Sequence, residues 1–240
     1  MQIRITLAQI RVSRTVADNK ANIINVLNRT EPNEWIIFPE GALSGYFPGE
    51  NSFLRDINGA EIDGALGEIV RLVGSRKCFC LLGSALCRSG TWYNSAIFLD
   101  PLGPSSIYHK RAITRLDSLH FQPGSKPCFQ TIAGTSFGVV ICREIMFPNL
   151  WSEYQTTGAQ IVFHLNNAIN QKDQIWEHLL IARAVENGFF SCSVNDASPP
   201  QTLPSFLVAP SGRVLIRSDV QREHIASATI DLDEVVKDFS

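Results

Sequence analysis

Three side chains with complementary chemistry each stand at the end of a strand-like run. Glu40 follows "IIFP", Lys110 follows "IYH" and Cys142 follows "GVVI". Loops at strand ends are where rigid scaffolds usually present catalytic groups. A carboxylate that accepts the thiol proton activates a cysteine, because only the thiolate attacks well. A lysine stabilises the oxyanion that forms when sulfur adds to a carbonyl. The three residues therefore predict nucleophilic attack by Cys142, with Glu40 as base and Lys110 beside the oxyanion.

Each of these residues also has a simpler structural explanation when it is taken alone. Free cysteines are commonly inert core residues, a lysine at a strand edge is usually solvated, and Glu40 after Pro39 can cap a turn. The combination of all three favours catalysis. A papain-type cysteine protease requires a histidine partner, and no histidine of the chain stands in a recognisable protease motif. The histidines are His109, His120, His164, His178 and His224.

The composition is that of an ordinary globular chain. Of its 240 residues, 45% are hydrophobic and 18% are charged, which supplies enough apolar surface for one substantial core. We expect a single domain over residues 1–240. The formal net charge of -2 provides no basic field that would attract nucleic acid or anionic lipid. We therefore expect a small-molecule partner, with no nucleic acid and no membrane.

The six cysteines predict neither a disulfide framework nor a metal site. They are scattered mainly through apolar runs of a chain much longer than a disulfide-stapled mini-domain, so reduced thiols are expected. Cys78 and Cys80 would face opposite sides of a strand, which is poor geometry for a metal. No metal and no cofactor is expected. The N-terminal segment lacks the long apolar stretch of a signal peptide, and no apolar run reaches membrane-spanning length. We expect a cytoplasmic protein.

Strand-like and helix-like runs alternate along the chain. The predicted helices cover 18–30, 61–75, 148–158 and 173–188. The predicted strands cover 3–10, 34–40, 78–86, 93–100, 105–112, 159–167, 189–196 and 224–232, with hairpins over 128–142 and 205–218. Asp18 or Asn19 is expected to cap the first helix, and Gly188 to end the last one. Helices that alternate with strands favour helix layers on sheets, while the hairpins indicate mixed rather than all-parallel sheets.

Three motifs around the reactive residues resemble those of the nitrilase superfamily of carbon-nitrogen hydrolases. They are "FPEGALSGYFP" around Glu40, "YHKRAI" around Lys110 with "FQPG" following, and "GVVICREIMFPNLW" around Cys142. Their order and spacing also resemble those of the family. The stretches "GAQIVFHLNNA", "ARAVENGFF" and "VAPSGRVL" extend the resemblance over nearly the whole chain.

The resemblance implies a fold, an assembly and a mechanism. The fold is an αββα sandwich, in which two mixed β-sheets are flanked by helices, and two copies pair into an αββα-αββα homodimer. The implied triad is Glu40, Lys110 and Cys142. Glu40 takes the thiol proton, and Lys110 with the backbone N–H of Arg143 stabilises the oxyanion. Glu40 then protonates the departing amine and activates the water that cleaves the thioester.

The resemblance also draws attention to Arg143 and Asp117. Arg143 stands where family members generally carry an aromatic or other residue. Its guanidinium either reaches an anionic group of the substrate, or it points outward or pairs with Glu144 or Glu153. Many members hold a second active-site glutamate after the lysine motif, and Asp117 is the nearest acidic residue to that place.

A further stretch, "HLNNA", replaces the more usual small, proline-containing segment of the family. His164, Asn166 and Asn167 either line the pocket or serve as loop and cap residues. Asn149 stands where the family commonly has glutamate after the proline of the cysteine motif. The chain is also short for the family, so the loops over the pocket are expected to be trimmed.

The implied function is hydrolysis of a non-peptide carbon-nitrogen bond in a small amide or N-carbamoyl compound. A cysteine thioester is the intermediate, and ammonia or an amine is released. One alternative is an N-acyltransferase of the same superfamily, because "ICREIMFP" also resembles the lipoprotein acyltransferase branch; the lack of a membrane-spanning run opposes a lipid substrate. The other is a non-catalytic member that binds a ligand, which the intact Glu40, Lys110 and Cys142 oppose.

Overall fold

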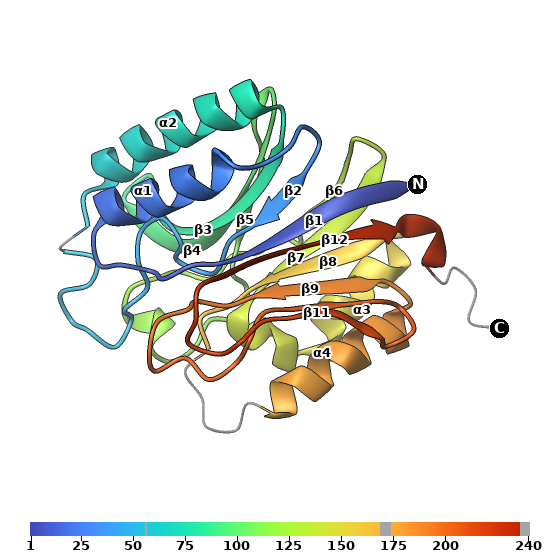
Figure 1. Ribbon diagram of the computed structural model, residues 1–240. Coiled ribbons are helices and arrows are strands. Elements are labelled where there is room, and N and C mark those ends of the chain that lie inside the picture. Colours follow the sequence, from blue (N-terminus) through green and yellow to red (C-terminus); the bar gives the residue numbers. More distant parts are fainter. Residues whose placement is uncertain (56, 169–173, 236–240) are drawn as a thin grey trace.

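The computed structural model describes residues 1–55, 57–168 and 174–235, whose strands form two six-stranded sheets packed face to face (Figure 1). The first sheet contains β1 (Gln2–Gln9), β2 (Trp35–Ile37), β3 (Phe79–Arg88), β4 (Thr91–Asp100), β5 (Gly103–His109) and β12 (His224–Asp231). The second contains β6 (Phe129–Ile132), β7 (Thr135–Ile141), β8 (Ile161–Leu165), β9 (Phe190–Val194), β10 (Phe206–Val208) and β11 (Val214–Arg217). The strand orders are β12-β1-β2-β3-β4-β5 and β11-β10-β9-β8-β7-β6.

Both sheets are mixed, as the sequence predicts. In the first sheet β1, β2 and β3 are parallel, and in the second β7, β8 and β9 are parallel, while every other pair is antiparallel. Helices connect the parallel strands, as parallel pairing requires. They are α1 (Val16–Leu27), α2 (Gly59–Arg76), α3 (Pro148–Thr156) and α4 (Gln174–Asn187). The predicted hairpins β6–β7 and β10–β11 both form, and the predicted strands over 93–100 and 105–112 pair as the antiparallel neighbours β4 and β5.

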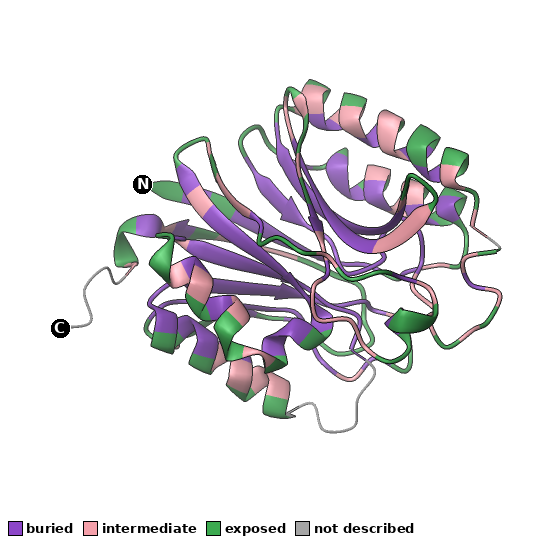
Figure 2. Ribbon diagram, turned by 180° about the vertical axis from the view of Figure 1, so that it is seen from behind, coloured by how far each residue is buried: buried purple, intermediate pink, exposed green. Residues whose placement is uncertain are grey.

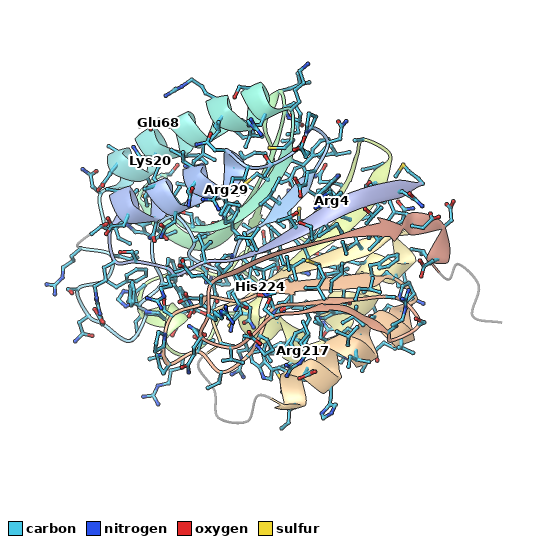
Figure 3. The ribbon with its side chains drawn as sticks, viewed as in Figure 1. Arg4, Lys20, Arg29, Glu68, Arg217 and His224 are labelled. Carbon is cyan, nitrogen blue, oxygen red and sulfur yellow. The ribbon has the colours of Figure 1, made fainter. Side chains whose placement is uncertain are left out.

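The helices cover the outer faces of the two sheets, which completes the predicted αββα sandwich (Figure 1). On the first sheet, α2 buries Ile62, Ile69 and Val73 in a cluster with the outward-facing strand residues. On the second sheet, α3 and α4 form the corresponding cluster. Figure 2 shows the strands buried between helices whose outer sides are exposed. Lys20 of α1 binds Glu68 of α2 at 2.9 Å on that exposed side (Figure 3).

A layer of aromatic rings fills the space between the sheets. Trp35 stacks on Phe79 with a centroid distance of 4.7 Å and on Phe163 of the other sheet at 6.0 Å. Trp35 and Ile37 face this layer, whereas Ile36 between them faces the helices. Strands buried on both faces require apolar residues at every position, which explains the uninterrupted apolar run of β2.

The first helix begins earlier than the sequence predicts. Thr15 is its N-cap, and the Thr15 side chain accepts a hydrogen bond from the backbone N–H of Asp18 at 3.2 Å. The expectation that Asp18 or Asn19 caps this helix is wrong. Asn19 is instead buried, and its side-chain nitrogen donates to the carbonyl oxygens of Ser13 and Leu43. These contacts hold the loop that follows β2 against the start of the helix.

The turn that carries Glu40 lies directly against β3. A Cβ atom at Gly83 would approach Gly41 N and Pro39 O to 2.5 Å, so only glycine allows this contact. Gly41 itself has a positive φ of 68°. The backbone N–H of Glu40 donates to the carbonyl oxygen of Asn166 at 3.3 Å, which links the ends of the two sheets. The first catalytic candidate is thus fixed by backbone contacts on both sides.

Three expectations from the sequence concern membrane-spanning helices, the start of the last helix and the number of domains. None of the helices among the described residues combines the length and the apolar composition needed to cross a bilayer. The helix predicted over 173–188 is α4, and its first predicted residue, Asp173, lies outside the described residues. The expected single domain over 1–240 stays a prediction.

Candidate active site

The ammonium group of Lys110 lies between two carboxylates at the ends of the strands. Its Nζ atom is 2.9 Å from Glu40 Oε1 and 2.8 Å from Asp117 Oδ2, and all three side chains are fully buried. Burial alone would lower the pKa of Lys110, but the charges of Glu40 and Asp117 outweigh it, so the pKa is raised. Lys110 therefore stays charged, because the cost of burying its charge is offset by two directly bound anions.

Asp117 is held in its ionised form on the far side of this lysine. Its Oδ1 atom accepts a hydrogen bond from the Tyr46 hydroxyl at 2.6 Å, and its Oδ2 atom accepts one from the backbone N–H of Thr114 at 2.9 Å. Burial acts to raise the pKa of Asp117, but Lys110 and these donors prevail and the pKa is lowered. The carboxylate stands in the 3₁₀ turn η1 (Asp117–Leu119), which the sequence did not predict.

Glu40 accepts hydrogen bonds from nitrogen donors through only one of its carboxylate oxygens. Oε1 accepts from Lys110 and also from Asn94 Nδ2 at 2.6 Å. Oε2 is buried and accepts no hydrogen bond from a nitrogen or oxygen of the described residues, and the thiol of Cys142 is the donor that interacts with this carboxylate. Burial raises the pKa of Glu40, and Lys110 offsets only part of that rise. A carboxylate with a raised pKa beside a thiol is suited to accept its proton.

Cys142 stands where β7 ends and the 3₁₀ turn η2 (Cys142–Met146) begins. Its φ of 49° lies in the left-handed region, which is rare for a residue other than glycine and occurs preferentially at functional sites. Burial raises the pKa of the thiol, and the negative charge of Glu40 raises it further. The resting thiol is therefore protonated, so it needs a base at the moment of attack.

His164 forms a hydrogen bond with the backbone of Cys142, whose φ is positive. Its Nε2 atom lies 2.8 Å from the carbonyl oxygen of Cys142, and its Nδ1 atom lies 2.9 Å from Ser193 Oγ. A carbonyl can only accept, so Nε2 carries the proton and Nδ1 accepts from the hydroxyl, which is the arrangement of a neutral imidazole. Burial lowers the pKa of His164 to about 4. This histidine is a neutral support for the turn.

Glu144 joins the loop of the lysine to the loop of the cysteine. Its carboxylate accepts hydrogen bonds from the backbone N–H groups of Ile141 at 2.7 Å, Arg111 at 2.7 Å and Ala112 at 3.0 Å. The Tyr108 hydroxyl donates to it as well, at 2.7 Å. Glu144 thus binds the residue that precedes Cys142 and the two residues that follow Lys110, so one buried side chain sets the distance between the two loops.

A cavity of about 570 Å³ opens at Cys142. Tyr46, Phe47, Leu116 and Trp176 give it apolar walls. The polar residues at this cavity are Glu50, Thr114, Arg115, Arg143 and Asn167. The volume lies in the range of small-ligand pockets.

A second cavity, of about 440 Å³, lies beside α1 on the outer face of the first sheet, where Figure 3 labels Arg4 and Arg29. Its central carboxylate, Glu34, already accepts from Arg4, from the Thr6 hydroxyl and from the backbone of Glu31. No thiol lines this cavity. Of these two cavities, only the one at Cys142 has a thiol on its lining.

The structure brings most of the residues singled out from the sequence to one place. Arg143 and Asn167 line the cavity, whereas Asn166 is fully buried and its carboxamide has no hydrogen-bond partner among the described residues. Arg143 pairs with neither Glu144 nor Glu153, because Glu144 bridges the loops and Glu153 binds Arg111.

Sequence reasoning missed three residues of this network: Tyr46, Asn94 and Glu144. Tyr46 and Glu144 stand inside the quoted motifs, which was the available signal for them. Asn94 lies next to Ser95 in a strand of mixed composition, so the sequence contains no signal for it.

Comparison with known proteins identifies the family. The family model described as carbon-nitrogen hydrolase matches residues 4–238. The chain belongs to this family. This carbon-nitrogen hydrolase is 26% identical over 248 residues to a probable nitrilase of Schizosaccharomyces pombe, covering 97% of this chain and 90% of that protein. It is 28% identical over 212 residues to an (R)-stereoselective amidase of a Pseudomonas species, covering 83% of this chain and 74% of that protein.

The fold of this carbon-nitrogen hydrolase is also shared with a solved structure. A Cys-to-Ala mutant of an amidase from Nesterenkonia AN1, a nitrilase-superfamily protein, superimposes with a TM-score of 0.85 at 20% identity, covering 97% of this chain and 92% of that one.

The first prediction concerns the bridge made by Glu144. Glu144→Gln keeps the size of the side chain but replaces an acceptor oxygen by a donor. At least one buried backbone N–H then loses its partner, at a cost of roughly 1–3 kcal/mol. We expect the urea-unfolding free energy to fall by that amount, and kcat to fall with it. Glu68→Gln, in the exposed pair with Lys20, is the control and should change stability by less than about 1 kcal/mol. Equal effects in the two variants would contradict the bridge.

The second prediction concerns pH. The folded pKa of His164 is about 4, below the ordinary value of about 6.5, so the unfolded chain binds a proton that the folded chain does not. The contribution of this neutral histidine to the free energy of unfolding is fully present above about pH 6.5. It falls by about 1.4 kcal/mol per pH unit as the pH drops toward 4. His164→Gln should flatten the pH dependence of the unfolding free energy over this window, whereas His178→Gln, exposed on α4, should not. Parallel curves for wild type and His164→Gln would refute the assignment.

Proposed function

We propose that Glu40, Lys110 and Cys142 form the catalytic triad of a hydrolase that cleaves a carbon-nitrogen bond of a small amide or N-carbamoyl compound. The observation that carries the proposal is the buried carboxylate of Glu40, whose Oε2 accepts from no nitrogen or oxygen of the described residues, in the same charge network as a protonated thiol at the cavity. The (R)-stereoselective amidase among the relatives supports an amide as the substrate.

In the first half of the reaction, Cys142 adds to the amide carbonyl while its proton passes to Glu40. The C–S bond forms as the carbonyl π bond opens, and the negative charge moves to oxygen. Lys110 Nζ and the backbone N–H of Arg143 stabilise that oxyanion. Glu40 then gives its proton to the nitrogen as the C–N bond breaks. Ammonia or an amine leaves, and the acyl group remains on sulfur as a thioester.

In the second half, Glu40 takes a proton from water and the hydroxide adds to the thioester carbonyl. The C–S bond breaks, the proton returns to sulfur and the carboxylic acid leaves. Asp117 acts as a positioning residue in this scheme, because it binds Lys110 and is not among the residues that line the cavity. No step requires a metal or a cofactor.

The third prediction tests the triad. Cys142→Ala should abolish ammonia release from a panel of small amides, whereas Cys87→Ala, a half-buried thiol on β3, should retain it. Glu40→Gln should slow turnover roughly a hundred- to ten-thousandfold, since it removes the proton acceptor. Circular dichroism of each variant checks the fold. Turnover by Cys142→Ala would overturn the proposal.

Product analysis in the same assays separates the alternatives. Appearance of the free acid with ammonia indicates hydrolysis. Transfer of the acyl group to an added amine or alcohol in preference to water indicates an acyltransferase. Retained ligand binding with no bond cleavage in the wild-type protein indicates a non-catalytic member.

We also propose a cytoplasmic homodimer. Ile175 and Val185 of α4 are about half exposed, at 50% and 47%, so this helix offers apolar surface to a second copy. All six cysteines are free, which suits a reducing compartment. The fourth prediction is a light-scattering mass of twice the 26.6 kDa of one chain, with the protein in the cytosolic fraction. A mass of one chain, or a membrane-bound fraction, would count against this assignment.

A further inference from the structure

The polar side of the cavity at Cys142 carries two arginines whose guanidinium groups pair with none of the described carboxylates. Neither Arg115 nor Arg143 makes a side-chain hydrogen bond or ion pair with a described residue, and the guanidinium carbon of Arg143 lies 5.8 Å from the centre of the Phe147 ring. Both residues line the cavity and both side chains are exposed. Arg143 follows the nucleophile directly, and Arg115 stands two residues before Asp117. Each is therefore attached to a loop that the Lys110 network fixes.

The acceptors of the same cavity are already occupied. Among the described residues that line it, Glu50 is the only acidic one, and both of its carboxylate oxygens bind the guanidinium of Arg14 at 2.6 Å. This bidentate pair neutralises Glu50 and leaves the charges of Arg115 and Arg143 uncompensated among the described residues. The described lining therefore carries an excess of positive charge on a chain whose formal net charge is -2.

Asn167 adds a further donor to this wall. Its Oδ1 atom accepts a hydrogen bond from Gln201 Nε2 at 2.6 Å, and that nitrogen also lies 3.4 Å from Asp196 Oδ2. Asp196 is itself fixed by the backbone N–H groups of Val12 and Ser198. The oxygen of Asn167 is thus taken, and its Nδ2 atom, which has no partner in the described part of the chain, is left as a donor.

We propose that Arg115, Arg143 and Asn167 form a subsite for a carboxylate on the substrate, so that the preferred substrates are short amides that carry an acid at the end distant from the scissile bond. A carboxylate has only acceptors, and this wall offers only donors. A neutral alkyl end would leave both guanidinium groups unpaired. The apolar walls from Phe47, Leu116 and Trp176 suit a short carbon chain between the amide and the acid.

The inference rests on the proposed function, since it assigns the specificity of the same active site. The fifth prediction compares two acidic amides, succinamate and glutaramate, with neutral amides of matched length, butyramide and valeramide. Wild-type protein should show a higher kcat/KM for the acidic member of each pair by roughly ten- to a hundredfold, the range for hydrogen bonds to a charged group. The double variant Arg115→Ala/Arg143→Ala should lose that ratio, mainly through KM.

Matched controls make the loss specific. Arg71→Ala removes an exposed arginine from α2, far from the cavity lining, and should keep the wild-type ratio. Arg143→Lys keeps the charge but not the two-pronged donor, so it should give an intermediate ratio. Arg143→Glu should turn the preference toward neutral amides. A wild-type protein that hydrolyses neutral and acidic amides equally well would overturn the subsite and leave the proposed function standing.

A binding experiment separates failure of the subsite from failure of the chemistry. Glutarate, the acid product of glutaramate, should bind to Cys142→Ala in calorimetry, and the additional Arg115→Ala/Arg143→Ala changes should weaken that binding by on the order of tenfold or more. If no amide is hydrolysed but glutarate binds through the two arginines, the proposed function fails and the anion subsite survives. If glutarate binds equally well without the arginines, or not at all, the subsite is refuted whatever the turnover.

Discussion

The structure depends on a single buried cation. Lys110 is completely removed from solvent, and an unpaired ammonium in that position would be strongly destabilising. Glu40 and Asp117 each form an ion pair with Lys110. If either carboxylate moved away, part of the charge would remain unpaired in the low-dielectric interior. The surrounding hydrogen bonds from Tyr46 and Asn94 hold the two carboxylates in place. The charged network is thereby rigid before any substrate arrives, which is the condition for electrostatic stabilisation of a transition state.

The two sheets divide the work between them. The first sheet supplies all three charges of the network, from the turn after β2, the end of β5 and the loop that follows it. The second sheet supplies the thiol from the end of β7. The distance between Glu40 and Cys142, the proposed base and nucleophile, is therefore set by how the sheets pack, through the aromatic layer around Trp35 and the bridges made by Glu144 and by the Glu40 backbone. The packing of the two sheets therefore determines the geometry of the candidate active site.

Periodicity was sufficient to predict helix layers on mixed sheets and the hairpins, because each depends on apolar spacing and turn residues close together in sequence. The β6–β7 turn at Gly134, which has a φ of 78°, is an example. The arrangement of two sheets face to face came only from the resemblance to the family. The start of α1 was missed because Thr15, Asp18 and Asn19 are all acceptable caps, and the choice among them is made by contacts of Asn19 with Leu43, distant in sequence. Motif resemblance selected Glu40, Lys110 and Cys142, but no local pattern shows that Glu144 turns toward Arg111 rather than toward its neighbour Arg143.

In the proposed mechanism, a buried thiol with a raised pKa is not an obstacle to catalysis, because of where the protons of the site lie. A preformed thiolate next to ionised Glu40 and Asp117 would place three negative charges around one lysine, and the raised pKa of Cys142 expresses that cost. In the proposed mechanism, transfer of the thiol proton to Glu40 during attack avoids this cost. The negative charge would then leave the carboxylate of Glu40 as it appears on the oxygen of the substrate, and Lys110, which binds Glu40, would stabilise the charge in both positions. In this scheme the net charge of the buried network and the bound substrate stays constant, and only the position of the negative charge changes. The transition state therefore adds no further buried charge, and the cost of removing charge from water is already offset by the ion pairs of the resting structure.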